Sequence, residues 1–114
     1  MARNKFDNPT AFNIQNELRQ MSKESENSTF EVSEEDNVVV TEFSQGKTTV
    51  TLFEREDGSA YVKLVHGTLE DEDYDMENYN LDQIKEIEFN KSTMRIYIQS
   101  EEGFCDWGVD TVNA

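Results

Sequence analysis

The residues best suited to chemistry in this chain are the carboxylates of segment 69–82, which lies within a run of 21 positions, 64–84, that holds no lysine or arginine. Neighbouring carboxylates ~6 Å apart repel each other by about 0.7 kcal/mol in water, and salt screening weakens this repulsion. Such a density opposes compact structure unless a cationic partner offsets it, so the segment predicts binding through negative charge. Its acids are Glu70, Asp71, Glu72, Asp73, Asp75, Glu77 and Asp82.

Aromatic and thioether side chains are mixed into the same segment, at Tyr74, Met76 and Tyr79. Disordered acidic linkers are poor in aromatic residues, whereas protein interfaces use tyrosine and methionine as contact area inside a polar rim. Carboxylates spaced along a surface can also replace phosphates, because the same lysine and arginine side chains bind either group. The segment is therefore suited to occupying the nucleic-acid channel of another protein. The alternative is a plain solvated loop.

A calcium loop is another interpretation of these acids. Counted as an EF-hand loop from residue 71 to residue 82, the segment has carboxylates at five ligand positions. However, position 6 is Met76, where the loop needs glycine for its sharp turn, and position 12 is Asp82 rather than the longer bidentate glutamate. We therefore expect no EF-hand, no metal and no other cofactor. Weak adventitious binding of Ca²⁺ or Mg²⁺, as in a metal-responsive module, is the alternative.

The sequence offers little for catalysis. His66 falls on an expected strand, where a histidine is more often packed or hydrogen-bonded than catalytic. Cys105 follows a phenylalanine and is expected to be a small apolar filler rather than a nucleophile. A carboxylate pair for glycoside hydrolysis could be drawn from any of 25 acids, so that match carries no weight, and the five glycines form no phosphate-binding loop. We predict that the protein is not an enzyme.

The formal charge is −15, from 25 acidic and 10 basic residues, and it is distributed unevenly. Residues 1–23 carry four bases against two acids, a net of +2, so the remaining 91 residues carry −17. A field of that sign repels nucleic acid and anionic lipid, and it speeds encounters with basic proteins ~10 to 10³-fold where steering is strong. We therefore expect a basic nucleic-acid-binding protein or nuclease as the partner, with no direct nucleic-acid or membrane binding. Solubility or salt adaptation is the alternative.

The cysteine content and the start of the chain point to a compartment. The first residues contain no apolar core of a signal peptide, and no run of ~18 apolar residues follows. One cysteine excludes a disulfide within the chain, and one cysteine with one histidine excludes a Cys/His zinc site. We expect a soluble protein of the reducing cytoplasm, or of the host cytoplasm if the protein is viral.

At 114 residues the chain has the size of a single domain, 1–114, in which the polar residues 1–7 are expected to be disordered. Asn8 and Pro9 predict a helix start, with asparagine as N-cap and proline at the first helical position. An apolar stripe follows at spacings of 3, 4 and 3, as on one face of a helix that ends near Lys23. We expect this helix to cover a sheet, the alternative being a helix for a partner or a dimer. The stripe consists of Ala11, Ile14, Leu18 and Met21.

From residue 29 onward, short runs rich in β-branched and aromatic residues alternate with turn residues, which predicts antiparallel strands. Asp57-Gly58 is the strongest hairpin signal, because both residues tolerate the positive φ of tight turns. Leu81–Lys85 predicts a short helical turn. The fold class predicted is α+β, an N-terminal helix packed on an antiparallel meander sheet of about five to seven strands. The strand runs are 29–33, 38–43, 48–54, 60–65, 86–90, 93–100 and 104–112.

A second candidate surface near the C-terminus has the same acidic and aromatic character. Trp107, the only tryptophan, either packs over the open end of a small core or is exposed as an anchor for a partner. The last strand is expected at an edge, where it could pair with its copy in a homodimer. The carboxylates of this surface are Glu101, Glu102, Asp106 and Asp110.

Together these features predict a non-enzymatic acidic inhibitor that binds a basic nucleic-acid-binding surface as a DNA or RNA mimic. In size and charge the chain resembles small acidic α+β proteins of that type, including phage antagonists of restriction and CRISPR enzymes and immunity proteins against nuclease toxins; the resemblance covers composition and no aligned motif. The alternative is a small accessory or structural-assembly protein that uses its helix or an edge strand, with acidity serving solubility. The expected contact residues are Glu70, Asp71, Glu72, Asp73, Tyr74, Asp75, Glu77, Tyr79, Asp82, Glu101, Glu102, Asp106 and Trp107.

Overall fold

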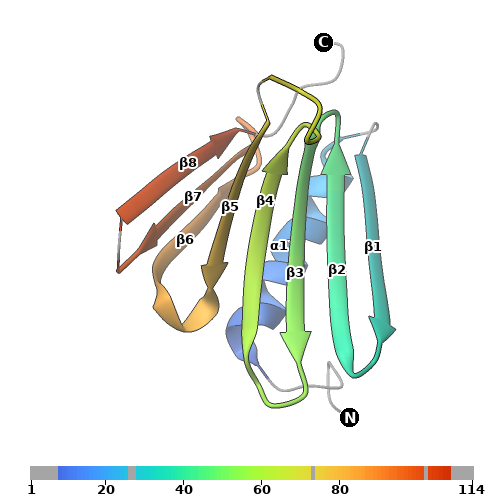
Figure 1. The fold of residues 1–114 in the computed structure, drawn as a ribbon, viewed down its shortest axis with the longest axis vertical. Helices are drawn as coiled ribbons and strands as arrows, with labels where there is room; N and C mark the ends of the chain where they lie inside the picture. Colours follow the sequence, from blue (N-terminus) through green and yellow to red (C-terminus); the bar gives the residue numbers. More distant parts are fainter. Residues whose placement is uncertain (1–7, 26–27, 73, 102, 109–114) are drawn as a thin grey trace.

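The computed structural model describes residues 8–25, 28–72, 74–101 and 103–108, and within these ranges it contains one α-helix, one short 3₁₀ helix and eight strands (Figure 1). The strands form two antiparallel sheets, with the orders β1-β2-β3-β4-β5 and β6-β7-β8. The elements are α1 (Pro9–Lys23), β1 (Ser28–Glu35), β2 (Val38–Gln45), β3 (Thr48–Arg55), β4 (Ala60–His66), β5 (Asp75–Asn80), η1 (Leu81–Gln83), β6 (Ile84–Asn90), β7 (Arg95–Ser100) and β8 (Gly103–Gly108).

The predicted fold class, a helix packed on antiparallel strands, is confirmed, and the number and grouping of the strands differ in detail. The extra strand is β5, which forms inside the acidic segment and pairs with β4. The meander then stops at η1, the short helical turn expected after position 80, and the chain continues into the separate three-stranded sheet. The described chain therefore has eight strands in two sheets instead of one sheet of five to seven.

Helix α1 begins and lies where the sequence predicts. The Asn8 side chain accepts a hydrogen bond from the Ala11 backbone N–H over 3.0 Å, and Pro9 occupies the first turn. The four stripe residues, Ala11 to Met21, are at most 1% exposed. The helix lies behind the five-stranded sheet in Figure 1 and contacts β1, β2 and β3. Its apolar stripe is thus used inside the protein and is not available to a partner helix.

Tight turns set the register of the first hairpins. Asp36 and Asn37 connect β1 to β2 with φ values of 54° and 64°, as a two-residue hairpin turn of the left-handed type requires. At the β3–β4 turn, the Asp57 carboxylate accepts hydrogen bonds from the backbone N–H and the hydroxyl of Ser59, and Gly58 has a φ of 92°. These local bonds fix which side chains of β2, β3 and β4 face the helix.

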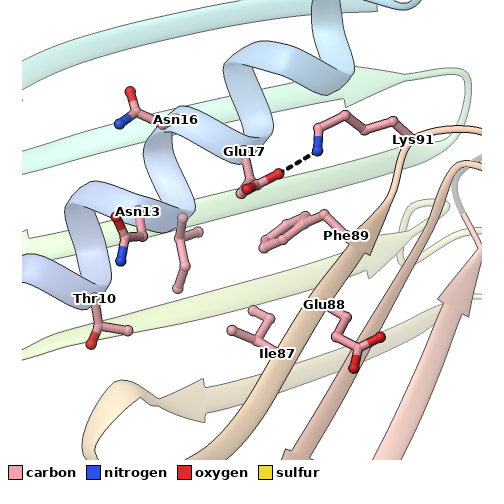
Figure 2. A pocket seen from close by; sticks show the side chains of 9 residues that line it. Thr10, Asn13, Asn16, Glu17, Ile87, Glu88, Phe89 and Lys91 are labelled. Carbon is pink, nitrogen blue, oxygen red and sulfur yellow. Dashed lines mark ion pairs between the residues drawn. The ribbon is translucent and has the colours of Figure 1, made fainter.

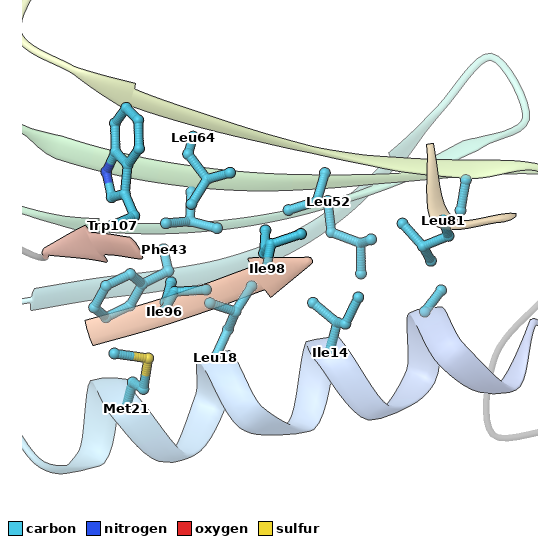
Figure 3. Close-up of a cluster of buried hydrophobic side chains, with 14 of the residues drawn as sticks. Ile14, Leu18, Met21, Phe43, Leu52, Leu64, Leu81, Ile96, Ile98 and Trp107 are labelled. Atoms are coloured by element: carbon cyan, nitrogen blue, oxygen red, sulfur yellow. The ribbon is translucent and has the colours of Figure 1, made fainter. Parts of the chain in front are cut away.

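The hydrophobic core lies between α1 and the inner faces of the two sheets, the inner face of each sheet being the one that faces the core (Figure 3). The three-stranded sheet contributes Ile96, Ile98 and Trp107, which join the helix stripe and the apolar side chains of β2, β3 and β4. One polar pair is buried with them, because Gln15 Nε2 donates to Thr41 Oγ1 over 3.0 Å. Among the described residues, no helix combines the length and the apolar character that a membrane crossing needs.

Candidate functional site

The acidic segment is half turn and half strand. Residues 67–74 connect β4 to β5, and β5 lies at the edge of the five-stranded sheet, where the described residues pair it with β4 alone. The register places Glu77 opposite Leu64 and Tyr79 opposite Val62, and opposed residues of antiparallel strands share a face. Glu77 and Tyr79 therefore face inward, toward the side where β8 lies. Because β5 is a strand, segment 71–82 does not have the form of an EF-hand loop.

Tyr79 serves the core more than the surface. Its ring packs against the buried cluster, and its hydroxyl donates to Glu77 Oε1 over 3.2 Å. The pKa of Tyr79 is raised mainly by burial, and also by contact with Cys105 and by the charge of Glu77. The phenol therefore stays protonated and remains a hydrogen-bond donor. Burial also raises the pKa of the Cys105 thiol, which keeps it in the protonated, unreactive form. Because the Tyr79 ring packs against the core, less of it is available to contact a partner than the sequence analysis predicted.

Asp71 is engaged inside the protein. Its Oδ2 accepts from the Thr68 backbone N–H over 2.8 Å, and its Oδ1 lies 3.9 Å from Lys47 Nζ. Gly67 has a φ of 81°, and a side chain there would meet Asp71 Oδ2 at 2.8 Å. The Asp71 carboxylate therefore closes the turn at the end of β4, which is a structural role that the sequence interpretation missed.

The second predicted surface, around the last strand, does not present its residues as expected. Arg95 Nε donates to Asp106 Oδ1 over 2.9 Å, so a cation of the same chain compensates that carboxylate. Trp107 is 8% exposed and belongs to the core cluster, which makes it a core residue and not an exposed anchor (Figure 3). Its Nε1 has no acceptor among the described residues. Asp73, Glu102 and Asp110 lie outside those residues.

Six predicted acids remain together along β5 and the turns at its two ends, a surface that we name the acidic edge. Five of them are exposed, and Glu77 is half-buried. Glu101 joins the group because its backbone N–H donates to the Gln83 oxygen over 3.1 Å, which brings the β7–β8 turn beside η1. Within the described residues, no ion pair connects any of the six to a lysine or arginine. The acidic edge consists of Glu70, Glu72, Asp75, Glu77, Asp82 and Glu101.

Exposed apolar side chains accompany the acidic edge, and of these only Met76 is among the residues that the sequence singled out. Leu69, in the turn before β5, is 84% exposed, and Met76 on β5 is 42% exposed. Tyr74 is half-buried. Leu69 went unrecognised because it is a single leucine at the start of the acidic run, where no periodicity distinguishes it. The apolar contact area beside the carboxylates thus includes Leu69 and Met76, and also Phe104 on β8, which is 70% exposed and lines a hollow together with Glu77.

The spacing of the carboxylates can be compared with that of a nucleic-acid strand. Alternate residues of a β-strand lie ~6.7 Å apart, so Asp75 and Glu77 have about that separation along β5. Duplex DNA carries one phosphate per ~3.4 Å of its axis on each strand. The linear charge density of β5 is therefore about half that of one DNA strand.

Acidic side chains are also found elsewhere on the protein. The far edge of the same sheet and its β1–β2 turn form a second acidic group, which the sequence shows as the run 34–36. On the outer face of β6, hydrogen bonding and repulsion from Glu88 raise the pKa of Glu86. The acidic edge is thus one of three acidic regions. The second group also has an exposed apolar residue, Val32 (43%), and the acidic edge differs by containing Leu69, the most exposed large apolar side chain of the described chain at 84%. The second group is Glu31, Glu34, Glu35, Asp36 and Glu42.

A cleft of about 640 Å³ between α1 and β6 was not expected from the sequence (Figure 2). Ile87 and Phe89 form its apolar side, and an ion pair of 2.6 Å between Lys91 Nζ and Glu17 Oε1 crosses one end. The sequence gives no signal for it, since the cleft exists only where the second sheet meets the helix. In the part of the chain that the structure describes, no group of three or more His, Cys, Asp or Glu side chains is placed to hold a metal.

Comparison with known proteins gives no match, since no protein-family model, no curated protein and no solved structure is significantly similar to this chain. The functional inference therefore depends on the side chains of the acidic edge itself.

Proposed function

We propose that this chain is a non-enzymatic binding protein whose acidic edge engages a basic, nucleic-acid-binding surface of another protein and so blocks access of nucleic acid. The observation that supports this function is the acidic edge, six carboxylates without an ion-pair partner in the described chain, next to exposed apolar side chains. Lysine and arginine side chains that bind phosphates can bind these carboxylates with the same geometry. An inhibitor of the anti-restriction, anti-CRISPR or nuclease-immunity type would have this property.

The charges and the apolar contacts have different roles in this proposal. Exposed ion pairs contribute only ~0.2–1 kcal/mol each, so they steer the encounter and set its orientation more than they hold the complex. Leu69 and Met76 supply apolar area that a partner can bury, and contacts of this kind carry most of the binding energy at interfaces. The partner surface is therefore expected to combine basic side chains with a nearby apolar depression.

The experiment compares two triple variants of equal net charge. The edge variant carries Glu70→Gln, Glu72→Gln and Asp75→Asn, which leaves Asp71 and its turn intact. The control variant carries the same number of neutral substitutions on exposed acids at other places in the fold. These are Glu24→Gln on the end of α1, Glu56→Gln in the β3–β4 turn and Glu88→Gln on β6.

Each protein is used to capture partners from a lysate of the source cells at low salt, followed by elution with a salt gradient. We expect the wild type and the control to retain the same nucleic-acid-binding protein, and the edge variant to lose it or release it at lower salt. Added duplex DNA should compete with the capture. Equal retention by both variants would show that the acidic edge is not the binding surface.

A further inference from the structure

The outer face of the five-stranded sheet, opposite α1, carries a band of apolar and aromatic side chains that no described element covers (Figure 1). The rings of Phe53 and Tyr61 are stacked with their centroids 4.6 Å apart, and the Arg55 guanidinium lies 5.0 Å from the centroid of the Tyr61 ring. A shallow hollow of the surface lies at this position. The strand register assigns to the band Val38, Val40, Phe53, Tyr61, Val65 and Met76.

One cross-strand row of this face carries opposite charges on the two sides of β3. Glu42 on β2 is paired with Thr51 on β3, and Thr51 is paired with Lys63 on β4. Because adjacent strands are ~4.8 Å apart, the backbone positions of Glu42 and Lys63 lie at about equal distances from β3, the middle strand. A two-fold axis along β3 would therefore place Glu42 of each copy over Lys63 of the other.

We propose that two copies of this chain associate through these outer faces about a two-fold axis that runs along β3. The same rotation places Val40 over Tyr61 of the second copy and Phe53 over its own equivalent, so apolar side chains oppose apolar ones. It also places Arg55 over its own equivalent, a like-charged contact that opposes the dimer. A two-fold axis across the strands would instead place each strand over its own copy, and it would pair no opposite charges because each of β2, β3 and β4 carries charge of only one sign on this face. Both charge pairs and the aromatic contact thus favour the axis along β3.

The size of the face and the charge of the chain set the strength of the dimer. Five strands ~4.8 Å apart, with eight residues at ~3.3 Å each, give a face of roughly 600 Å². A standard interface buries about 800 Å² on each partner. Repulsion between two chains of net charge −15 opposes association, and salt screens it. We therefore expect a weak dimer that forms at concentrations on the order of tens of micromolar and is favoured by added salt.

The charges of the two interactions are separate, because the side chains of Asp75 and Glu77 point away from the outer face, whereas Met76 is shared by the dimer face and the partner surface. Salt also separates the two interactions. Partner binding at the acidic edge should weaken as salt increases, whereas self-association of two like-charged copies should strengthen.

Sedimentation velocity of the full chain between 10 μM and 500 μM, at 0.15 M and 0.5 M salt, tests the proposal. Glu42→Lys lowers the net negative charge but places a cation opposite Lys63 of the second copy, so we expect the dimer to weaken at least tenfold. Glu24→Lys causes the same change in net charge at the end of α1 and should leave the dimer as strong or stronger. The double variant Glu42→Lys/Lys63→Glu restores opposite charges and should restore the dimer.

A wild-type protein that stays monomeric up to 500 μM at both salt concentrations would overturn the proposal. It would also be overturned if Glu42→Lys and Glu24→Lys dimerised equally well, since the surface would then not be the one described. Phe53→Thr provides a second variant that keeps the charge and suits a strand, and it should also weaken the dimer at least tenfold. Thermal unfolding of every variant checks that the fold is retained.

Discussion

Arg95 donates from Nε to the Oδ1 atom of Asp106 over 2.9 Å and from Nη2 to the backbone oxygen of Asp106 over 3.1 Å, and so joins β7 to the edge strand β8. The two side chains are 48% and 53% exposed, and ion pairs this open to solvent contribute little to stability. The pair nevertheless changes the surface charge, because it compensates an acid that the sequence assigned to partner binding. The same holds for Asp71, which lies beside Lys47.

The Arg95 pair leads to a prediction about Asp106. We expect Asp106→Asn to lower the free energy of unfolding by less than ~1 kcal/mol and to leave partner capture unchanged, because Arg95 already offsets this charge. Asp75→Asn, which removes one charge from the acidic edge, should weaken capture. Urea unfolding and the lysate capture measure the two effects. A loss of capture as large for Asp106→Asn as for Asp75→Asn would contradict the assignment of the edge.

The buried stripe of α1 leads to a prediction about stability. Leu18 is 0% exposed in the core cluster, and replacing a buried leucine by alanine costs about 2.7–5 kcal/mol. We expect Leu18→Ala to lower the free energy of unfolding by that amount. Gln20→Ala, at an exposed position of the same helix, should change it by less than ~0.5 kcal/mol. A similar, small effect of both substitutions in urea unfolding would mean that the stripe does not pack in the core.

The neighbouring acids of β6 lead to a prediction about pH. The hydrogen bond to Glu88 and the repulsion of its carboxylate raise the pKa of Glu86 in the folded protein, so the folded state binds this proton more tightly than the unfolded state does. Stability from this site is therefore present at low pH and is lost as pH rises through the folded pKa. Glu86→Gln should raise the melting temperature at pH 7 and have no effect near pH 3. An effect of equal size at both pH values would exclude this repulsion as the cause.

The parts of the fold that depend on neighbouring residues could be predicted from the sequence. The Asn8 cap and the Pro9 start define the helix locally, and Asp57-Gly58 defines its hairpin, so these elements lie where the sequence predicts. Strand ends differ by a few residues. For example, β7 begins only at Arg95 because Met94 has a φ of 55° and lies in the turn.

The parts that depend on distant residues could not be predicted. Strand β5 is rich in polar residues and has no strong β-propensity, and it is a strand because β4 provides its hydrogen-bonding partner. The ion pairs around the candidate site could not be predicted for the same reason. Lys47 and Arg95 are 24 and 11 residues from the acids that they compensate, and no local pattern joins them. Only the exposed acids of the acidic edge remain as the sequence predicted them, and their role in binding stays a prediction.

The most direct test of the proposed function is a displacement measurement with the captured partner. The partner is bound to a fluorescent oligonucleotide, and anisotropy is followed while the wild type, the edge variant or the charge-matched control is added. If the acidic edge occupies the nucleic-acid site, the wild type and the control release the oligonucleotide at the same concentration, and the edge variant needs at least tenfold more. If the oligonucleotide stays bound in a ternary complex, or if all three proteins release it equally, the acidic edge does not act as a substitute for nucleic acid.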